Sequence, residues 1–126
     1  MAQGVITRKG REKLCKAHAG DIVLPRIVKM VFGNGGINEV GKIVEPTGKE
    51  TQLKGFLLEK EIEKHTFPDT TTVRYTATLG KTELANENIS EQGLVDEEGD
   101  LILYKTFLPK GKDDDMEFIF DMDEIF

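Results

Sequence analysis

The stretch that decides the fold consists of two apolar runs on either side of an acidic turn: Ile89-Ser90-Glu91-Gln92-Gly93-Leu94-Val95, Asp96-Glu97-Glu98-Gly99-Asp100 and Leu101-Ile102-Leu103-Tyr104-Lys105-Thr106-Phe107. The runs contain β-branched and aromatic residues, which are typical of strands, and the turn carries a glycine near its tip. The sequence therefore predicts a β-hairpin over residues 89–107.

Two segments around this hairpin alternate between apolar and polar side chains, as half-buried antiparallel strands do. Residues 72–79 place Val73, Tyr75, Ala77 and Leu79 on one face, and residues 116–122 do the same with Met116, Phe118, Phe120 and Met122. We expect a strand in each segment. Pro109 and Gly111 predict a loop over residues 108–115.

The segment 57–66 fits two patterns. Leu53 and Leu57 have the spacing of a helical turn, whereas the glutamates at 59, 61 and 63 alternate with other side chains. We favour a strand over residues 57–66, which ends at the turn Phe67-Pro68-Asp69.

Within residues 26–36 we expect a mostly buried strand from Arg26 to Phe32, with Val28, Met30 and Phe32 on one face. It stops at Gly33-Asn34-Gly35-Gly36, where several residues can adopt positive φ. Residues 37–52 contain glycine and proline without a clear period, so we expect a long loop there.

Residues 1–20 predict a short helix. Thr7 is a candidate N-cap, Gly20 is a natural stop, and Leu14, Ala17 and His18 share the expected apolar face. The fold class is therefore α+β: one N-terminal helix followed by a mainly antiparallel β domain of five to six strands, in a single domain over residues 1–126.

Composition excludes several classes of protein. The chain has 126 residues with one cysteine, two histidines and no tryptophan, so it has no internal disulfide framework and no cysteine-rich zinc site. It also lacks an apolar run of about 18 residues, so we expect no membrane insertion. Residues 1–11 lack the apolar core of a signal peptide, which predicts synthesis in a reducing cytoplasm.

Charge is distributed unevenly along the chain. Residues 1–54 carry ten basic and five acidic side chains, net +5, and residues 55–126 carry seven basic and eighteen acidic ones, net −11. The basic segment has no interleaved aromatic residues and the whole chain is at −6, so we expect no nucleic-acid partner. The two halves are instead expected to attract each other, within one chain or between chains.

No residue qualifies as a catalytic, cofactor-binding or metal-binding site. Cys15 and His18 lack an orienting partner, and His65 has no second ligand nearby. We expect the acidic turn 96–100 to lack both the alternate acidic spacing and the distant bidentate glutamate of an EF-hand, and both this turn and Asp113-Asp114-Asp115 to be solvated. The glycine-rich turn 33–36 lacks the Gly-Lys-Ser/Thr ending of a phosphate loop. We therefore predict a non-catalytic protein without cofactors.

The hairpin sequence resembles a signature of the phage tail-collar fibre family, I-x-E-x-G-L-F-D-E-x-G-x-L-I, with Val95 in place of the usual Phe. Three other segments are similar to members of this family in the same order. They are Thr7, Gly10, Leu14 and Ala17 of the expected helix, Phe32-Gly33-Asn34-Gly35-Gly36, and the stretch Phe107 to Phe120 with Pro109-Lys110-Gly111-Lys112-Asp113.

The resemblance implies a structural component of the virion tail of a phage, prophage or phage-tail-like bacteriocin, which attaches a tail fibre to the baseplate. It implies a homotrimer, other tail or baseplate proteins as partners, and only indirect contact with the host surface. No fibre shaft follows, so the chain is expected to be either part of a longer fibre or a short baseplate-associated protein.

Two other functions remain open from the residues. A host-surface glycan-binding module would need flat aromatic platforms, and the chain offers only Tyr75 and Tyr104 besides its phenylalanines. A depolymerase would use two carboxylates, but acidic residues are too abundant here to single out a pair.

Overall fold

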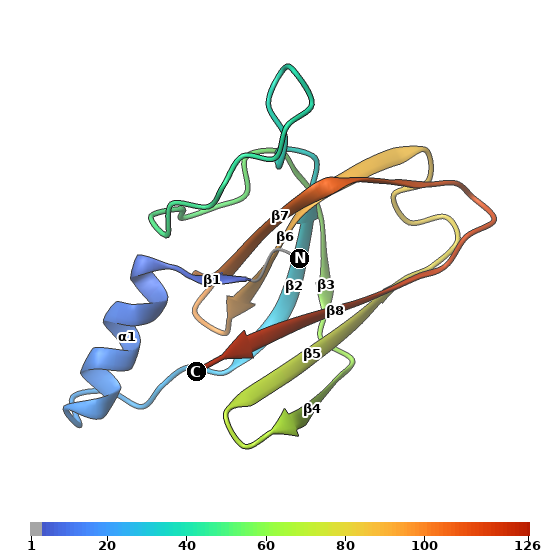
Figure 1. Ribbon diagram of the computed structural model, residues 1–126. Coiled ribbons are helices and arrows are strands. Elements are labelled where there is room, and N and C mark those ends of the chain that lie inside the picture. Colours follow the sequence, from blue (N-terminus) through green and yellow to red (C-terminus); the bar gives the residue numbers. More distant parts are fainter. Residues whose placement is uncertain (1–3) are drawn as a thin grey trace.

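The computed structural model describes residues 4–126, which form one helix and two antiparallel β-sheets (Figure 1). The elements are β1 (Val5–Ile6), α1 (Arg8–His18), β2 (Ile27–Gly33), β3 (Phe56–Glu61), β4 (Lys64–Asp69), β5 (Thr72–Leu79), β6 (Glu87–Asp96), β7 (Leu101–Lys112) and β8 (Phe118–Ile125). One sheet has the order β1-β7-β6-β2-β3 and the other β4-β5-β8. The predicted fold class is confirmed, but the described residues contain eight strands rather than five to six.

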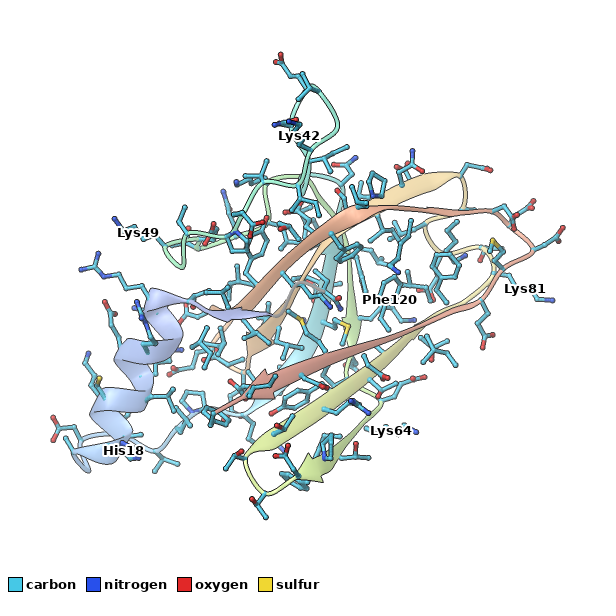
Figure 2. All side chains as sticks on the ribbon, viewed as in Figure 1. His18, Lys42, Lys49, Lys64, Lys81 and Phe120 are labelled. Carbon is cyan, nitrogen blue, oxygen red and sulfur yellow. The ribbon has the colours of Figure 1, made fainter. Side chains whose placement is uncertain are left out.

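The main core lies between the two sheets. Phe120 of β8 packs against Phe32 of β2 with ring centroids 4.9 Å apart, and Figure 2 shows Phe120 between the two layers. The other fully buried members come from both sheets: Met30, Ala77, Leu79, Ile89, Leu94, Leu103 and Met122. Burial of this many apolar side chains is the principal stabilising contribution to such a fold.

The predicted hairpin is confirmed as β6 and β7, the strands with the most extensive pairing in the chain. The expected loop 108–115 is wrong in its first part, because β7 continues to Lys112. The ladder is irregular between Ile89 and Glu91, and Pro109 lies opposite this irregularity. A proline has no N–H to donate, so it is tolerated at such a break.

The expected strand 57–66 is in fact two strands in different sheets. Ile62 N donates to Val28 O at 3.0 Å, whereas Glu63 N donates to Thr76 O at 2.9 Å. The chain therefore leaves β2 and joins β5 between these two residues. The alternation of side chains continues where the chain passes from one sheet to the other, and the sequence therefore suggests one strand.

The helix follows its predicted N-cap, but it spans Arg8–His18 rather than residues 1–20, because Val5–Ile6 form β1. The predicted face is correct for Leu14 and Ala17, which are half-buried, and wrong for His18. Thr7 is the N-cap, and its hydroxyl accepts from Gly10 N at 3.1 Å and donates to Leu101 O at 2.6 Å. The buried helix residues are Gly10 and Lys13, whereas His18 is exposed at the C-terminal end (Figure 2). A side chain at Gly10 would lie 3.0 Å from Ile102 O, so this glycine lets the helix approach β7 closely. Residues 1–3 of the expected helix lie outside the described residues.

The long loop over residues 37–52 contains no helix or strand, as expected, and is attached to the larger sheet. Thr106 Oγ1 donates to Val44 O at 2.9 Å, and Arg8 N donates to Gly48 O at 2.6 Å. Beyond the loop, Leu53 joins Val31, Leu101 and Tyr104 in a second apolar cluster on the outer face of that sheet. The larger sheet therefore packs apolar side chains on both faces.

Gly93 is required by close packing in the hairpin. A Cβ there would lie 2.5 Å from Leu101 Cδ1 and 2.9 Å from Leu103 O. We expect Gly93→Ala to lower the free energy of unfolding by about 1–3 kcal/mol, the usual effect of overpacking a core. Gly80→Ala is the matched control, because a Cβ at Gly80 would meet only Glu83 Oε1 at 3.4 Å. Equal urea midpoints for the two variants would contradict this account.

Candidate functional site

The acidic turn of the hairpin surrounds the ammonium group of Lys13. Lys13 Nζ lies 2.6 Å from Asp96 Oδ2, 2.9 Å from Glu98 Oε1 and 2.7 Å from Asp100 Oδ2. Asp96 is buried and also accepts from the backbone N–H groups of Glu98 and Asp100, at 3.0 and 3.1 Å. The cluster therefore ties α1 to the tip of the hairpin through charge-assisted hydrogen bonds.

Two opposing effects act on Lys13. Burial by itself would lower the pKa of its ammonium group, but hydrogen bonds to Asp100, Asp96 and Glu98 outweigh burial and raise the pKa well above its ordinary value. While its carboxylate partners are ionised, a lysine with a raised pKa stabilises the fold fully below about 10.5, and this contribution is lost as pH rises through the folded-state pKa. Lys13 is therefore a fixed positive charge under physiological conditions.

The expectation that the turn 96–100 is solvated is wrong for Asp96, which is buried, whereas Glu97, Glu98 and Gly99 are exposed. Asp96, Glu98 and Asp100 each offer a carboxylate oxygen within 4.8 Å of the others, and they are the one such group among the described residues. Their alternate spacing, which places three carboxylates on one side of a turn, is the signal that sequence reasoning missed. Because Lys13 supplies the positive charge between them, we read the cluster as an internal ion pair rather than as a metal site.

Removal of the Lys13 charge should be costly. We expect Lys13→Met to lower the free energy of unfolding by about 3 kcal/mol, at the lower end for a broken buried pair because Glu98 and Asp100 remain partly hydrated. Methionine matches lysine in helix propensity, so the change reports on charge.

Lys9→Met is the control for this experiment, because Lys9 is exposed and only reaches Glu12 at 4.0 Å. We expect its effect on thermal or urea unfolding to stay below about 0.5 kcal/mol. Similar losses in the two variants would show that the cluster contributes no more than a surface pair.

Glu91, also in the hairpin signature, is fully buried and accepts four hydrogen bonds. Its Oε1 accepts from Lys54 N at 3.1 Å and from Tyr104 Oη at 2.6 Å, and its Oε2 accepts from Gly35 N at 2.9 Å and from Gly55 N at 2.6 Å. All four partners are donors, so the carboxylate acts as an acceptor at every position, as an ionised group does. Burial, and next the bond to Glu91, raise the pKa of Tyr104.

The glycine-rich turn 33–36 therefore does bind an anionic group, but that group belongs to the chain itself. A Cβ at Gly35 would lie 2.6 Å from Gly55 N and 2.8 Å from Glu91 Oε2, so the carboxylate can be approached this closely only by glycine. Gly36 N donates to Ser90 Oγ at 3.0 Å. The backbone N–H groups of Gly35 and Gly36 therefore bond to side chains of β6.

The remaining candidates are not brought together into a catalytic arrangement. Cys15 and His18 are exposed on the helix, and Asp113, Asp114 and Asp115 are exposed between β7 and β8. Asp115 N donates to Asp113 Oδ1 at 2.9 Å, as in an ordinary polar turn. These residues give no indication of a nucleophile or a metal centre.

His65 differs from them because it lies in an aromatic groove. The groove has a volume of about 420 Å³ and is lined by residues of α1, of the segment that follows α1 and of the smaller sheet. Figure 1 shows where these elements lie. The His65 ring lies 5.6 Å from Phe67 and 6.2 Å from Tyr75, centroid to centroid. Further walls are supplied by Leu24, Pro25, Ile27, Val73, Ile102 and Phe126.

Glu124 lines this groove and is only 7% exposed. It continues the inward face of β8 formed by Phe120 and Met122, and it lies opposite Val73 in the ladder. No hydrogen bond or ion pair from residues 4–126 compensates its charge, and burial raises the pKa of its carboxyl group. Burial, with the Glu124 charge as a second cause, raises the pKa of Tyr75 to about 12.

A second cavity, of about 570 Å³, lies at the other end of the molecule near Phe107, Phe118 and Ile119. Its charged residues carry both signs: Lys105, Lys110, Glu117 and Asp121. Because these charges can balance one another, this cavity shows less chemical preference than the Glu124 groove.

The burial of Glu124 predicts a pH-dependent effect of neutralising it. Above the raised pKa the folded chain holds an uncompensated charge, so Glu124→Gln should increase the free energy of unfolding at neutral pH. As pH falls through the folded pKa, wild-type Glu124 binds a proton before the unfolded chain does, and the advantage of glutamine should vanish below about 4.5. Glu117→Gln, on an exposed residue, is the control; an advantage that persists at acidic pH would contradict the assignment.

No protein family, curated protein or solved structure matches the chain at a significant level. The helix of the described residues, α1, is too short and too polar to cross a membrane.

Proposed function

We propose that the chain is a structural, non-catalytic adaptor of a phage, prophage or phage-tail-like particle, which attaches a tail fibre to the baseplate and assembles as a homotrimer. The support is the resemblance to the tail-collar fibre family together with the positions of the residues that carry it. Thr7 and Gly10 lie at the contact of the helix with β7. In the hairpin, Glu91 accepts a hydrogen bond from the turn before β3, and Asp96 pairs with the helix.

The proposal rests mainly on where the matching residues lie in the fold. The matching residues come from three distant segments, yet several lie in contacts that join those segments: Thr7 with Leu101 of β7, and Gly35 with Glu91 of β6. Asp96 of the signature also contacts the helix, through Lys13, which is not one of the matching residues. A chance similarity would not be expected to select residues that depend on one another in space. Their role is internal, which suits a scaffold that presents its outer surface to partners.

Exposed apolar side chains give a second, weaker reason to expect an assembly. Several lie on or beside the smaller sheet: Phe67, Met116, Ile119, Ile125 and Phe126, which are between 40% and 68% exposed. Apolar surface of this kind is covered when chains associate.

The proposed trimer can be tested by light scattering at tens of micromolar protein and physiological salt. We expect a mass about three times the 14.1 kDa of one chain. A monomer under these conditions would contradict the trimer.

Salt should also weaken the assembly. Some basic side chains of residues 1–54 pair with acidic side chains of residues 55–126 within the chain. Lys13 pairs with the turn 96–100, and Lys29 pairs with Glu59. If the remaining charge joins chains, raising the salt concentration to about 1 M shortens the screening length to about 3 Å and should lower the mass. An unchanged mass from low to high salt would exclude electrostatic attraction as the cause of association.

A further inference from the structure

We propose that the groove beside Glu124 binds a lysine or arginine side chain, flanked by apolar residues, from a segment of a partner protein. The inference stands on the groove itself and does not depend on the virion role or on the trimer.

The first argument is the state of Glu124. Buried carboxylates are normally paired, because removing a charge from water without compensation costs several kcal/mol. Elsewhere in the described chain this rule holds: Glu91 accepts four hydrogen bonds, and Asp96 contacts Lys13. Glu124 is the exception among the described residues: none of them bonds to it, and only solvent in the open groove reaches its carboxylate oxygens.

The second argument is that neither Lys13 nor Arg26, the lysine and arginine that line the groove, pairs with Glu124. Lys13 is held by the three carboxylates of the turn, and Arg26 Nε lies 3.9 Å from Glu97 Oε2. The other titratable groups that line the groove are Asp96, His65 and Tyr75, and none of them makes a hydrogen bond to Glu124. None of the described residues therefore bonds a positive charge to Glu124, and we assign that charge to another molecule.

The third argument is the lining. His65, Phe67, Tyr75 and Phe126 provide aromatic surface, and Leu24 and Pro25 provide aliphatic surface. Aromatic rings attract a cation over their faces and also cover the methylene stem of a lysine or arginine. At about 420 Å³ the groove falls within the size range of ligand pockets. A neutral apolar ligand would leave the carboxylate buried and unpaired.

The probe for a test is a pair of short peptides, acetyl-Ala-Leu-Arg-Leu-Ala-amide and the same peptide with citrulline in place of arginine. Citrulline keeps the shape of arginine but carries no charge. We expect the arginine peptide to shift the amide resonances of Phe67, Tyr75 and Glu124 in ¹⁵N-labelled protein. The citrulline peptide should bind at least about tenfold more weakly, because it leaves Glu124 unpaired.

Three variants separate the contributions. Glu124→Gln should remove the preference for arginine, and Phe67→Ala, at a position 67% exposed and therefore safe for folding, should weaken both peptides. Glu117→Gln removes one negative charge outside the groove and should leave binding unchanged.

Several results would overturn the proposal. These are an absence of shifts at millimolar peptide, equal binding of the two peptides, a preference that survives in Glu124→Gln, and shifts confined to the cavity near Phe118. Methyl glycosides that shift the same amides in place of the peptides would assign the groove to a glycan. Loss of self-association in Glu124→Gln alone would assign it to a second copy of the chain.

Discussion

The four hydrogen bonds to the buried carboxylate of Glu91 are the constraint on which the larger sheet depends. They connect the middle of β6 with the turn after β2, the turn before β3 and the side chain of Tyr104 in β7. A buried carboxylate that lacks some of its hydrogen bonds destabilises the fold. We therefore expect the three segments that donate to Glu91 to depend on one another for their positions. The Lys13 cluster does the same between α1 and the hairpin turn.

The molecule therefore contains two kinds of buried charge. Glu91 and Lys13 are compensated from within the chain, and they account for why a short helix and several irregular turns hold defined positions on a sheet. Glu124 is compensated by nothing in residues 4–126 and lies at the open end of the smaller sheet. Charges that lower stability without an internal partner are typical of binding surfaces. We therefore regard the larger sheet, with its internally paired charges, as the scaffold, and we expect a partner at the open end of the smaller sheet.

The sequence predicted the parts of this fold that follow from local alternation. Residues 72–79 form the strand expected, since apolar side chains at every second position specify which face is buried. The hairpin was expected from its apolar runs and its turn, but β6 is buried on both faces and does not alternate. The break between Ile62 and Glu63 was missed because alternation does not say which strand a residue pairs with. The partners of Glu91 lie 13 to 56 positions away, and no local pattern encodes such distances. Glu124 could have been noticed, since it continues the face of Phe120 and Met122 with a charged residue.

Amide hydrogen exchange at Gly35 and Gly55 tests the central claim most directly, because both N–H groups donate to Glu91 Oε2. We predict that these two turn amides exchange as slowly as the core amides of β6 in the wild-type protein. In Glu91→Gln, which cannot accept at all four positions, they should lose protection by more than the change in global stability explains. Rapid exchange of Gly35 and Gly55 in the wild type, or unchanged protection in the variant, would contradict the account.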